Sequence, residues 1–208
     1  MSDDLLRDLD DFFAKTYTDF DRISAMPSYE SVTISQILKN RNRIEEGQIA
    51  TNEMRKIAWQ PNRDAVLAEL KERHVDSAFS FSFRPAPLGA RIRAFFGSKA
   101  HAGALLAAFV RKYGGREEEA AEHLGLSPAV WKGLCRGRFL PEKQLLFRAM
   151  LSYGFSREDG AVLMRAAGAY YDMNTVQDVV VCYLVSYRVL NRDMIARAFA
   201  EYRLRPVL

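Results

Sequence analysis

Apolar residues recur at helical spacing along most of the chain, and the first example lies at its beginning. Between Ser2 and Lys15, five leucine and phenylalanine residues fall on one helical face, and acidic residues occupy the other. This pattern predicts an amphipathic helix that contributes to a core or an interface. Similar spacing predicts helices over Ser31–Glu46 and Asn62–Arg73. The apolar residues of the first helix are Leu5, Leu6, Leu9, Phe12 and Phe13.

The pattern changes between Ala78 and Pro87, where the sequence reads AFSFSFRPAP. Phenylalanine alternates with serine, and a period of two indicates an extended segment with its rings on one side. The two prolines that follow exclude a helix or a central strand. Because no partner strand is visible, we expect an extended linker that packs Phe79, Phe81 and Phe83 onto a helical body.

We place a domain boundary after this linker, near Gly97-Ser98. Residues 1–98 would then form a helical N-terminal region of unknown role, serving as an interface or in oligomerisation. Residues 99–208 would form a second, all-helical module that begins with a helix from Ala102 and ends that helix at Gly114-Gly115. The fold class predicted for the whole chain is all-α.

Later helices of the second module begin at recognisable start signals. Pro141 begins one helix, and Asn191 caps the last. Ser156 with Asp159, and Thr175 with Asp178, have the spacing of a capping box, with aspartate in place of the usual glutamate. The inward positions predicted for these helices are Leu145, Leu146, Ala149, Met150, Val176, Val179, Val180, Tyr183, Leu184, Tyr187, Met194, Ile195, Ala198, Phe199 and Tyr202.

The stretch from Gly114 to Gly137, GGREEEAAEHLGLSPAVWKGLCRG, has the pattern of a helix-turn-helix. Two short apolar-periodic segments meet at LGLS, residues 124–127, where a glycine turn is followed at once by a helix start. Ser127 is an N-cap candidate, and Pro128 occupies the first helical position. A second helix placed in this way commonly presents side chains to the DNA major groove.

These residues resemble a known family. The stretch Gly115–Gly168 is similar to the five-helix domain of Cro/repressor-type (XRE-like) helix-turn-helix regulators, through the LGLS turn, the CRGR exit loop and the proline and helix that follow. The longer stretch Leu105–Leu208 is similar to a C-terminal helical module appended to varied bacterial proteins. The resemblance implies a helix-turn-helix domain with two additional C-terminal helices, in a bacterial DNA-binding transcription regulator.

The distribution of charge supports a nucleic-acid partner. The formal net charge is +4, and residues 1–98 carry 14 basic against 15 acidic side chains, so the second half holds the whole positive excess. Positive charge gathers around the second helix of the motif and its exit loop. We therefore predict that Lys132, Arg136, Arg138 and Lys143 contact DNA phosphates, and that Ser127 caps the helix and reaches a base.

Other residues argue against detailed reading of base edges. Pro128 and Ala129 stand at the start of the second helix and donate no hydrogen bond, and Trp131 is expected in the core. Three acids, Glu117–Glu119, would repel a phosphate backbone. Two hypotheses stay open: a DNA-binding regulator with mainly phosphate contacts, or a protein-interaction adaptor without a nucleic-acid role. The adaptor would use the tyrosines Tyr170, Tyr171 and Tyr187 as its surface.

The sequence offers no candidate for catalysis, a cofactor or a metal site, so we expect a protein that is not an enzyme. Cys135 and Cys182 lie in apolar helical patterns and are expected to be small buried residues. No apolar run is long enough to span a membrane, and no leader is evident, which favours a cytoplasmic location. Expected partners are double-stranded DNA, and a second copy or another protein bound through residues 1–98.

Overall fold

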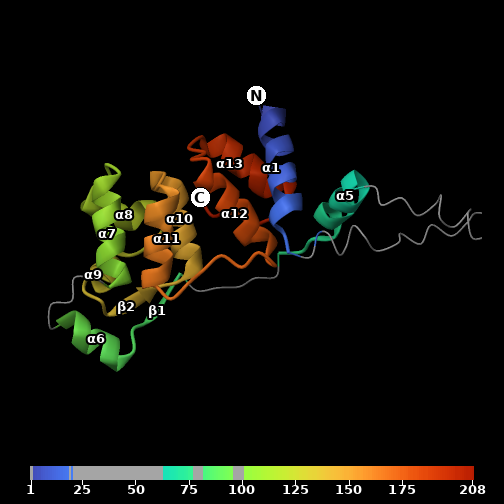
Figure 1. The fold of residues 1–208 in the computed structure, drawn as a ribbon. Coiled ribbons are helices and arrows are strands. Elements are labelled where there is room, and N and C mark those ends of the chain that lie inside the picture. Colours follow the sequence, from blue (N-terminus) through green and yellow to red (C-terminus); the bar gives the residue numbers. More distant parts are fainter. Residues whose placement is uncertain (1, 19, 21–62, 77–81, 96–100) are drawn as a thin grey trace, which may run out of the picture. The chain divides into compact units, whose positions relative to one another are not determined.

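The computed structural model describes residues 2–18, 20, 63–76, 82–95 and 101–208. These residues are mostly helical, as predicted, and contain one two-stranded sheet (Figure 1). The predicted helix over Ser31–Glu46 lies outside the described residues. The elements are α1 (Ser2–Thr16), α5 (Arg63–Arg73), β1 (Phe83–Pro85), α6 (Leu88–Phe95), α7 (Ala102–Lys112), α8 (Glu117–His123), α9 (Pro128–Cys135), β2 (Phe139–Pro141), α10 (Lys143–Tyr153), α11 (Arg157–Ala166), α12 (Val176–Ser186) and α13 (Arg192–Glu201).

The chain divides into two compact units. One contains Met1–Tyr17 together with His74–Leu208, and the other contains Thr18–Arg73, in which α5 confirms the helix predicted over Asn62–Arg73. The predicted division at residue 98 does not coincide with this grouping. The reason is that two N-terminal elements contact the second half of the chain: α1 packs on α12 and α13, and β1 pairs with β2.

Helix α12 lies at the centre of the larger unit. The helices α1, α10, α11 and α13 all contact it, and every residue from Val176 to Val185 is buried. The sequence pattern predicted one inward stripe, whereas the helix is buried on all sides. Some of its outer positions are apolar, and the polar Gln177 and Asp178 are paired with side chains of α10. Tyr187, predicted to face inward, is 65% exposed just beyond the end of the helix.

Helix α1 confirms the amphipathic helix predicted at the N-terminus. Leu9 and Phe13 are fully buried, and the ring centroids of Phe13 and Tyr202 lie 4.8 Å apart. The Tyr202 hydroxyl donates a hydrogen bond to Asp10 over 2.7 Å. The apolar face of α1 is therefore part of the core formed by α12 and α13.

The segment predicted as an unpaired linker contains a strand with a partner. Strand β1 pairs antiparallel with β2, and Arg84 stands opposite Leu140 (Figure 1). The Phe83 and Phe139 rings meet edge to face at 5.2 Å. Strand β2 also corrects the helix start predicted at Pro141, since α10 begins at Lys143. Phe79 and Phe81 lie outside the described residues.

The helix caps match the sequence prediction in part. Ser127, Ser156 and Asn191 cap α9, α11 and α13 through side-chain oxygens that accept backbone N–H groups. The two predicted capping boxes do not close. Asp159 accepts hydrogen bonds from Lys112 and Tyr113, and the Ser156 N–H donates to the Tyr113 hydroxyl.

Thr175 makes no side-chain capping bond at the start of α12. Its hydroxyl donates instead to Asp172, and the Asp178 carboxylate accepts a hydrogen bond from the Lys143 ammonium. The spacing that indicated a capping box thus belongs to a different polar cluster, described below.

Candidate nucleic-acid interface

A tight turn joins α8 to α9. Gly125 adopts a φ of +65°, a left-handed conformation that glycine accepts without strain, and the Leu126 N–H donates to the Ala121 carbonyl over 2.7 Å. The Ser127 hydroxyl then accepts from the Val130 N–H at 3.3 Å and begins α9. Leu124 is fully buried below the turn. The local sequence therefore holds the two short helices in one arrangement.

The side chain of Arg148 in α10 holds this turn in place through hydrogen bonds. Its Nη1 donates to the Leu124 carbonyl at 2.9 Å, and its Nε donates to the Val207 carbonyl at 2.7 Å. The side chain thus joins the α8–α9 turn to the segment around Val207, which is itself buried. Although Arg148 adds to the positive charge of this region, its guanidinium N–H groups are engaged with backbone carbonyls of the fold.

Helix α9 has one buried and one exposed face. Trp131 and Leu134 point into the core, which confirms the core position expected for Trp131. Ala129, Lys132 and Arg136 are exposed and share the opposite face through their spacing of three and four residues. An approaching partner would therefore meet a small apolar side chain followed by two cations.

Gly133, an unusual residue in the middle of a helix, makes room for β2. A Cβ atom at this position would lie 2.5 Å from two carbons of the Phe139 ring. The ring of Phe139 contacts the ring of Phe83 on its other side. Strand β1 thereby supports the position of α9 through the chain Phe83, Phe139 and Gly133.

This packing predicts that Gly133→Ala lowers stability in the wild-type protein and raises it when Phe139 is absent. Gly133→Ala is expected to destabilise the protein by about 1 kcal/mol, because displacement of the Phe139 ring outweighs the gain in helix propensity. In a Phe139→Ala background the same substitution is expected to stabilise by about 0.5 kcal/mol. Urea unfolding of the four proteins measures both effects, and equal effects in the two backgrounds would show that Phe139 does not pack against Gly133.

The chain after α9 adds a third cation. Arg136 is the C-cap of α9, Gly137 has a φ of +69°, and the Arg138 N–H donates to the Gly133 carbonyl over 2.8 Å. Lys132, Arg136 and Arg138 are all exposed, and within the described part of the chain none of them forms an ion pair. We call these three residues the α9 basic surface.

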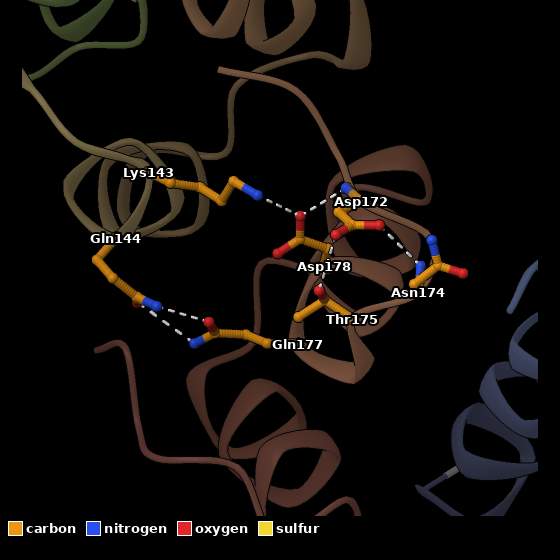
Figure 2. A network of polar contacts seen from close by, with 7 residues as sticks. All are labelled: Lys143, Gln144, Asp172, Asn174, Thr175, Gln177 and Asp178. Atoms are coloured by element: carbon orange, nitrogen blue, oxygen red, sulfur yellow. Dashed lines mark hydrogen bonds and ion pairs between the residues drawn. The ribbon is translucent and has the colours of Figure 1, made fainter. Parts of the chain in front are cut away.

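Lys143, the fourth predicted phosphate contact, is not available in the same way. Its Nζ lies 2.6 Å from the Asp178 carboxylate, and its side chain is 31% exposed while that of Asp178 is 2% exposed (Figure 2). The sequence identified the positive charge of Lys143 but not its partner, because Asp178 lies 35 residues later. We therefore leave Lys143 out of the α9 basic surface.

Ser127 lies at the exposed start of α9, as predicted. Its hydroxyl oxygen is engaged with the Val130 N–H, so the capping role is confirmed. The hydroxyl hydrogen remains a potential donor. Contact with a base stays a prediction.

The acids Glu117–Glu119 at the start of α8 are exposed, and two of them are paired. Glu117 lies 2.8 Å from Arg111, and Glu119 lies 3.1 Å from Arg116. These pairs reduce the negative charge that the sequence suggested at this helix start. Because the groups are exposed, the pairs add little stability.

One basic residue near the exit loop was missed by sequence reasoning. Pairing of β1 with β2 brings Arg84 beside this loop, where it forms an ion pair of 2.9 Å with Glu142, and the neighbouring Ala86 N–H donates to the Arg138 carbonyl. No local pattern could have indicated this position, since it depends on pairing between segments more than 50 residues apart.

Other kinds of site find little support. Burial raises the pKa of the Cys135 and Cys182 thiols, which disfavours the reactive thiolate. In the described ranges, no group of three histidine, cysteine or acidic residues gathers as metal ligands would. No helix of those ranges has the length and apolar character needed to cross a bilayer.

Comparison with known proteins yields no match to a family model, to a curated protein or to a solved structure. The α9 basic surface and the helices that position it are therefore the features from which a function can be inferred.

Proposed function

We propose that α8 and α9 act as a helix-turn-helix of the Cro/repressor type that binds duplex DNA mainly through its phosphates. The observation that carries this proposal is the α9 basic surface: three exposed cations on one helix and its exit loop, without ion-pair partners in the described part of the chain. From Ser127 to Pro141 no acidic residue interrupts them. Such a surface neutralises phosphates and releases counterions.

The composition of α9 favours backbone contacts over base reading. Pro128 and Ala129 occupy the exposed start of the helix and supply no polar hydrogen, and the Ser127 oxygen already accepts a capping bond. Phosphate contacts position a protein on DNA without identifying bases. We therefore expect modest discrimination between DNA sequences.

Charge reversal of the surface provides the test. Arg136→Glu/Arg138→Glu is expected to weaken binding of a labelled 30-base-pair duplex at least about 100-fold at low salt, because two phosphate contacts become repulsive. Fluorescence anisotropy measures the affinity. The matched control is Arg165→Glu/Arg192→Glu, which makes the same change in net charge at exposed positions on α11 and α13. Equal losses in the two double variants would show that only overall charge matters.

The second candidate function, a protein-interaction module, is favoured by exposed aromatic side chains. Tyr170 is 75% exposed and Tyr187 is 65% exposed. Tyr171 is half-buried and stacks on Phe147, so it does not belong to such a surface. Absence of DNA binding by the wild-type protein at low salt would favour this alternative.

A further inference from the structure

A groove of about 450 Å³ lies where α11 ends and the chain turns toward α12. Its lining comes from Ala161, Met164 and Arg165 of α11 and from Ala169, Tyr170 and Tyr171 of the loop that follows. Its volume is in the range of sites that hold small organic molecules. The groove does not involve the α9 basic surface.

The loop side of the groove is held in place by a polar network (Figure 2). Gly168 follows the end of α11 with a φ of +71°, and the next N–H, that of Ala169, donates to the Met164 carbonyl over 2.9 Å. The Asp172 N–H then donates to the buried Asp178 carboxylate over 2.7 Å, and the same carboxylate binds Lys143 of α10. These bonds fix the chain directly after Tyr171, at one end of the groove lining.

The tyrosines give the groove two aromatic walls of different character. Tyr171 stacks on Phe147 with an interplanar angle of 13°, and its hydroxyl lies 3.8 Å from the sulfur of Met150. Tyr170 is largely exposed, and the Lys143 ammonium lies 5.9 Å from its ring centroid. Between aromatic rings and the buried thioether of Met164, the small side chains leave space for a flat apolar group.

Arg165 places a positive charge at the groove. Its side chain is exposed. Burial, with the nearby Cys182 and Asp178, raises the pKa of the Tyr171 hydroxyl, and the charge of Arg157 opposes this rise only in part. The nearby carboxylates are engaged: Asp178 binds Lys143, and Asp172 accepts from the Asn174 N–H and the Thr175 hydroxyl. The Arg165 guanidinium, for which no ion pair is found among the described residues, is thus the group of the groove that can pair with an anion.

From this combination we infer that the groove binds a small planar aromatic molecule that carries an anionic group. The ring system lies between Tyr170 and Met164, and the anion pairs with the Arg165 guanidinium. An aromatic carboxylate and an aromatic phosphate share this chemistry.

The test uses 2-naphthoate as the probe, with naphthyl phosphate as a second anion and 2-naphthylmethanol as a neutral analogue. The methionine methyl groups, labelled with ¹³C, report binding by NMR, and Met164 is the one in the groove. We expect both anions to shift the Met164 signal saturably, and the neutral analogue to bind about tenfold more weakly.

Two substitutions separate the anion site from the apolar site. Arg165→Gln is expected to weaken 2-naphthoate about tenfold and to leave 2-naphthylmethanol unchanged, whereas Ala161→Phe fills the groove and prevents binding of both. Arg192→Gln is the matched control. The inference is overturned if Met164 shows no saturable shift, or if Arg165→Gln and Arg192→Gln bind 2-naphthoate equally well. Because no DNA is present, the result does not depend on the proposed function.

Discussion

Replacing Gly103 by alanine is expected to destabilise the protein by about 3 kcal/mol. Gly103 lies in α7 where that helix contacts α9, and a Cβ atom there would stand 1.9 Å from the Leu134 carbonyl oxygen. This neighbour is backbone, so it cannot rotate away as a side chain could. The helices must separate, which disturbs the burial of Leu134 and moves the exposed face of α9.

Urea unfolding measures this loss, and Gly89→Ala is the matched control. Gly89 is also helical, but a Cβ at this position would meet no atom within 4 Å. The control is expected to leave stability unchanged or to raise it by up to about 1 kcal/mol. A loss below about 1 kcal/mol for Gly103→Ala would show that α7 and α9 are not in backbone contact at this point.

Lys143→Met is expected to destabilise the protein by about 2 kcal/mol at neutral pH. The substitution leaves the buried Asp178 carboxylate with the Asp172 N–H as its described hydrogen-bond donor. The loop between α11 and α12 should loosen as a result. Lys132→Met is the control, since it removes an exposed lysine of α9 and should change stability by less than about 0.5 kcal/mol.

The same pair gives a pH dependence with a definite sign. Burial raises the pKa of Asp178 above its ordinary value, and hydrogen bonds from Asp172 and Lys143 oppose that rise. Loss of Lys143 should therefore raise this pKa further. A group whose pKa is higher in the folded than in the unfolded state favours the folded state when it is protonated. The stability loss of Lys143→Met should therefore be complete at pH values above the Asp178 pKa of the folded variant. The loss should shrink as the pH falls through that pKa.

Carboxyl ¹³C NMR follows the titration of Asp178, and urea unfolding at several pH values follows stability. An Asp178 pKa that is the same in both proteins would contradict the ion pair. A stability loss that does not shrink on acidification would contradict the pH dependence.

The helices of the second half could be predicted because their signals are local. Ser127, Ser156 and Asn191 each lie next to the helix that they cap, and Trp131 and Leu134, which the apolar spacing placed in the core, lie within one helical turn of each other. Such interactions join residues close in sequence, so periodicity and capping rules detect them.

The features that escaped prediction join distant segments. Strand β1 lies in the segment predicted to be extended, but its partner β2 is more than 50 residues away and has only three residues, too few for a periodic pattern. The packing of α1 on α12 and α13, and the pairing of Lys143 with Asp178, likewise depend on the tertiary fold. All three residues of the α9 basic surface were among the predicted phosphate contacts. The fourth, Lys143, is paired with a carboxylate that its neighbours in sequence do not reveal.

The salt dependence of DNA affinity tests the central proposal most directly. For a generic duplex, the logarithm of the association constant should fall linearly with the logarithm of salt concentration, since each neutralised phosphate releases counterions. For Arg136→Gln/Arg138→Gln we predict binding that is weaker and a slope less steep by about 1.8, which corresponds to two lost phosphate contacts. No binding by the wild-type protein at low salt, or a slope that the double substitution leaves unchanged, would contradict the proposal that α9 binds the DNA backbone.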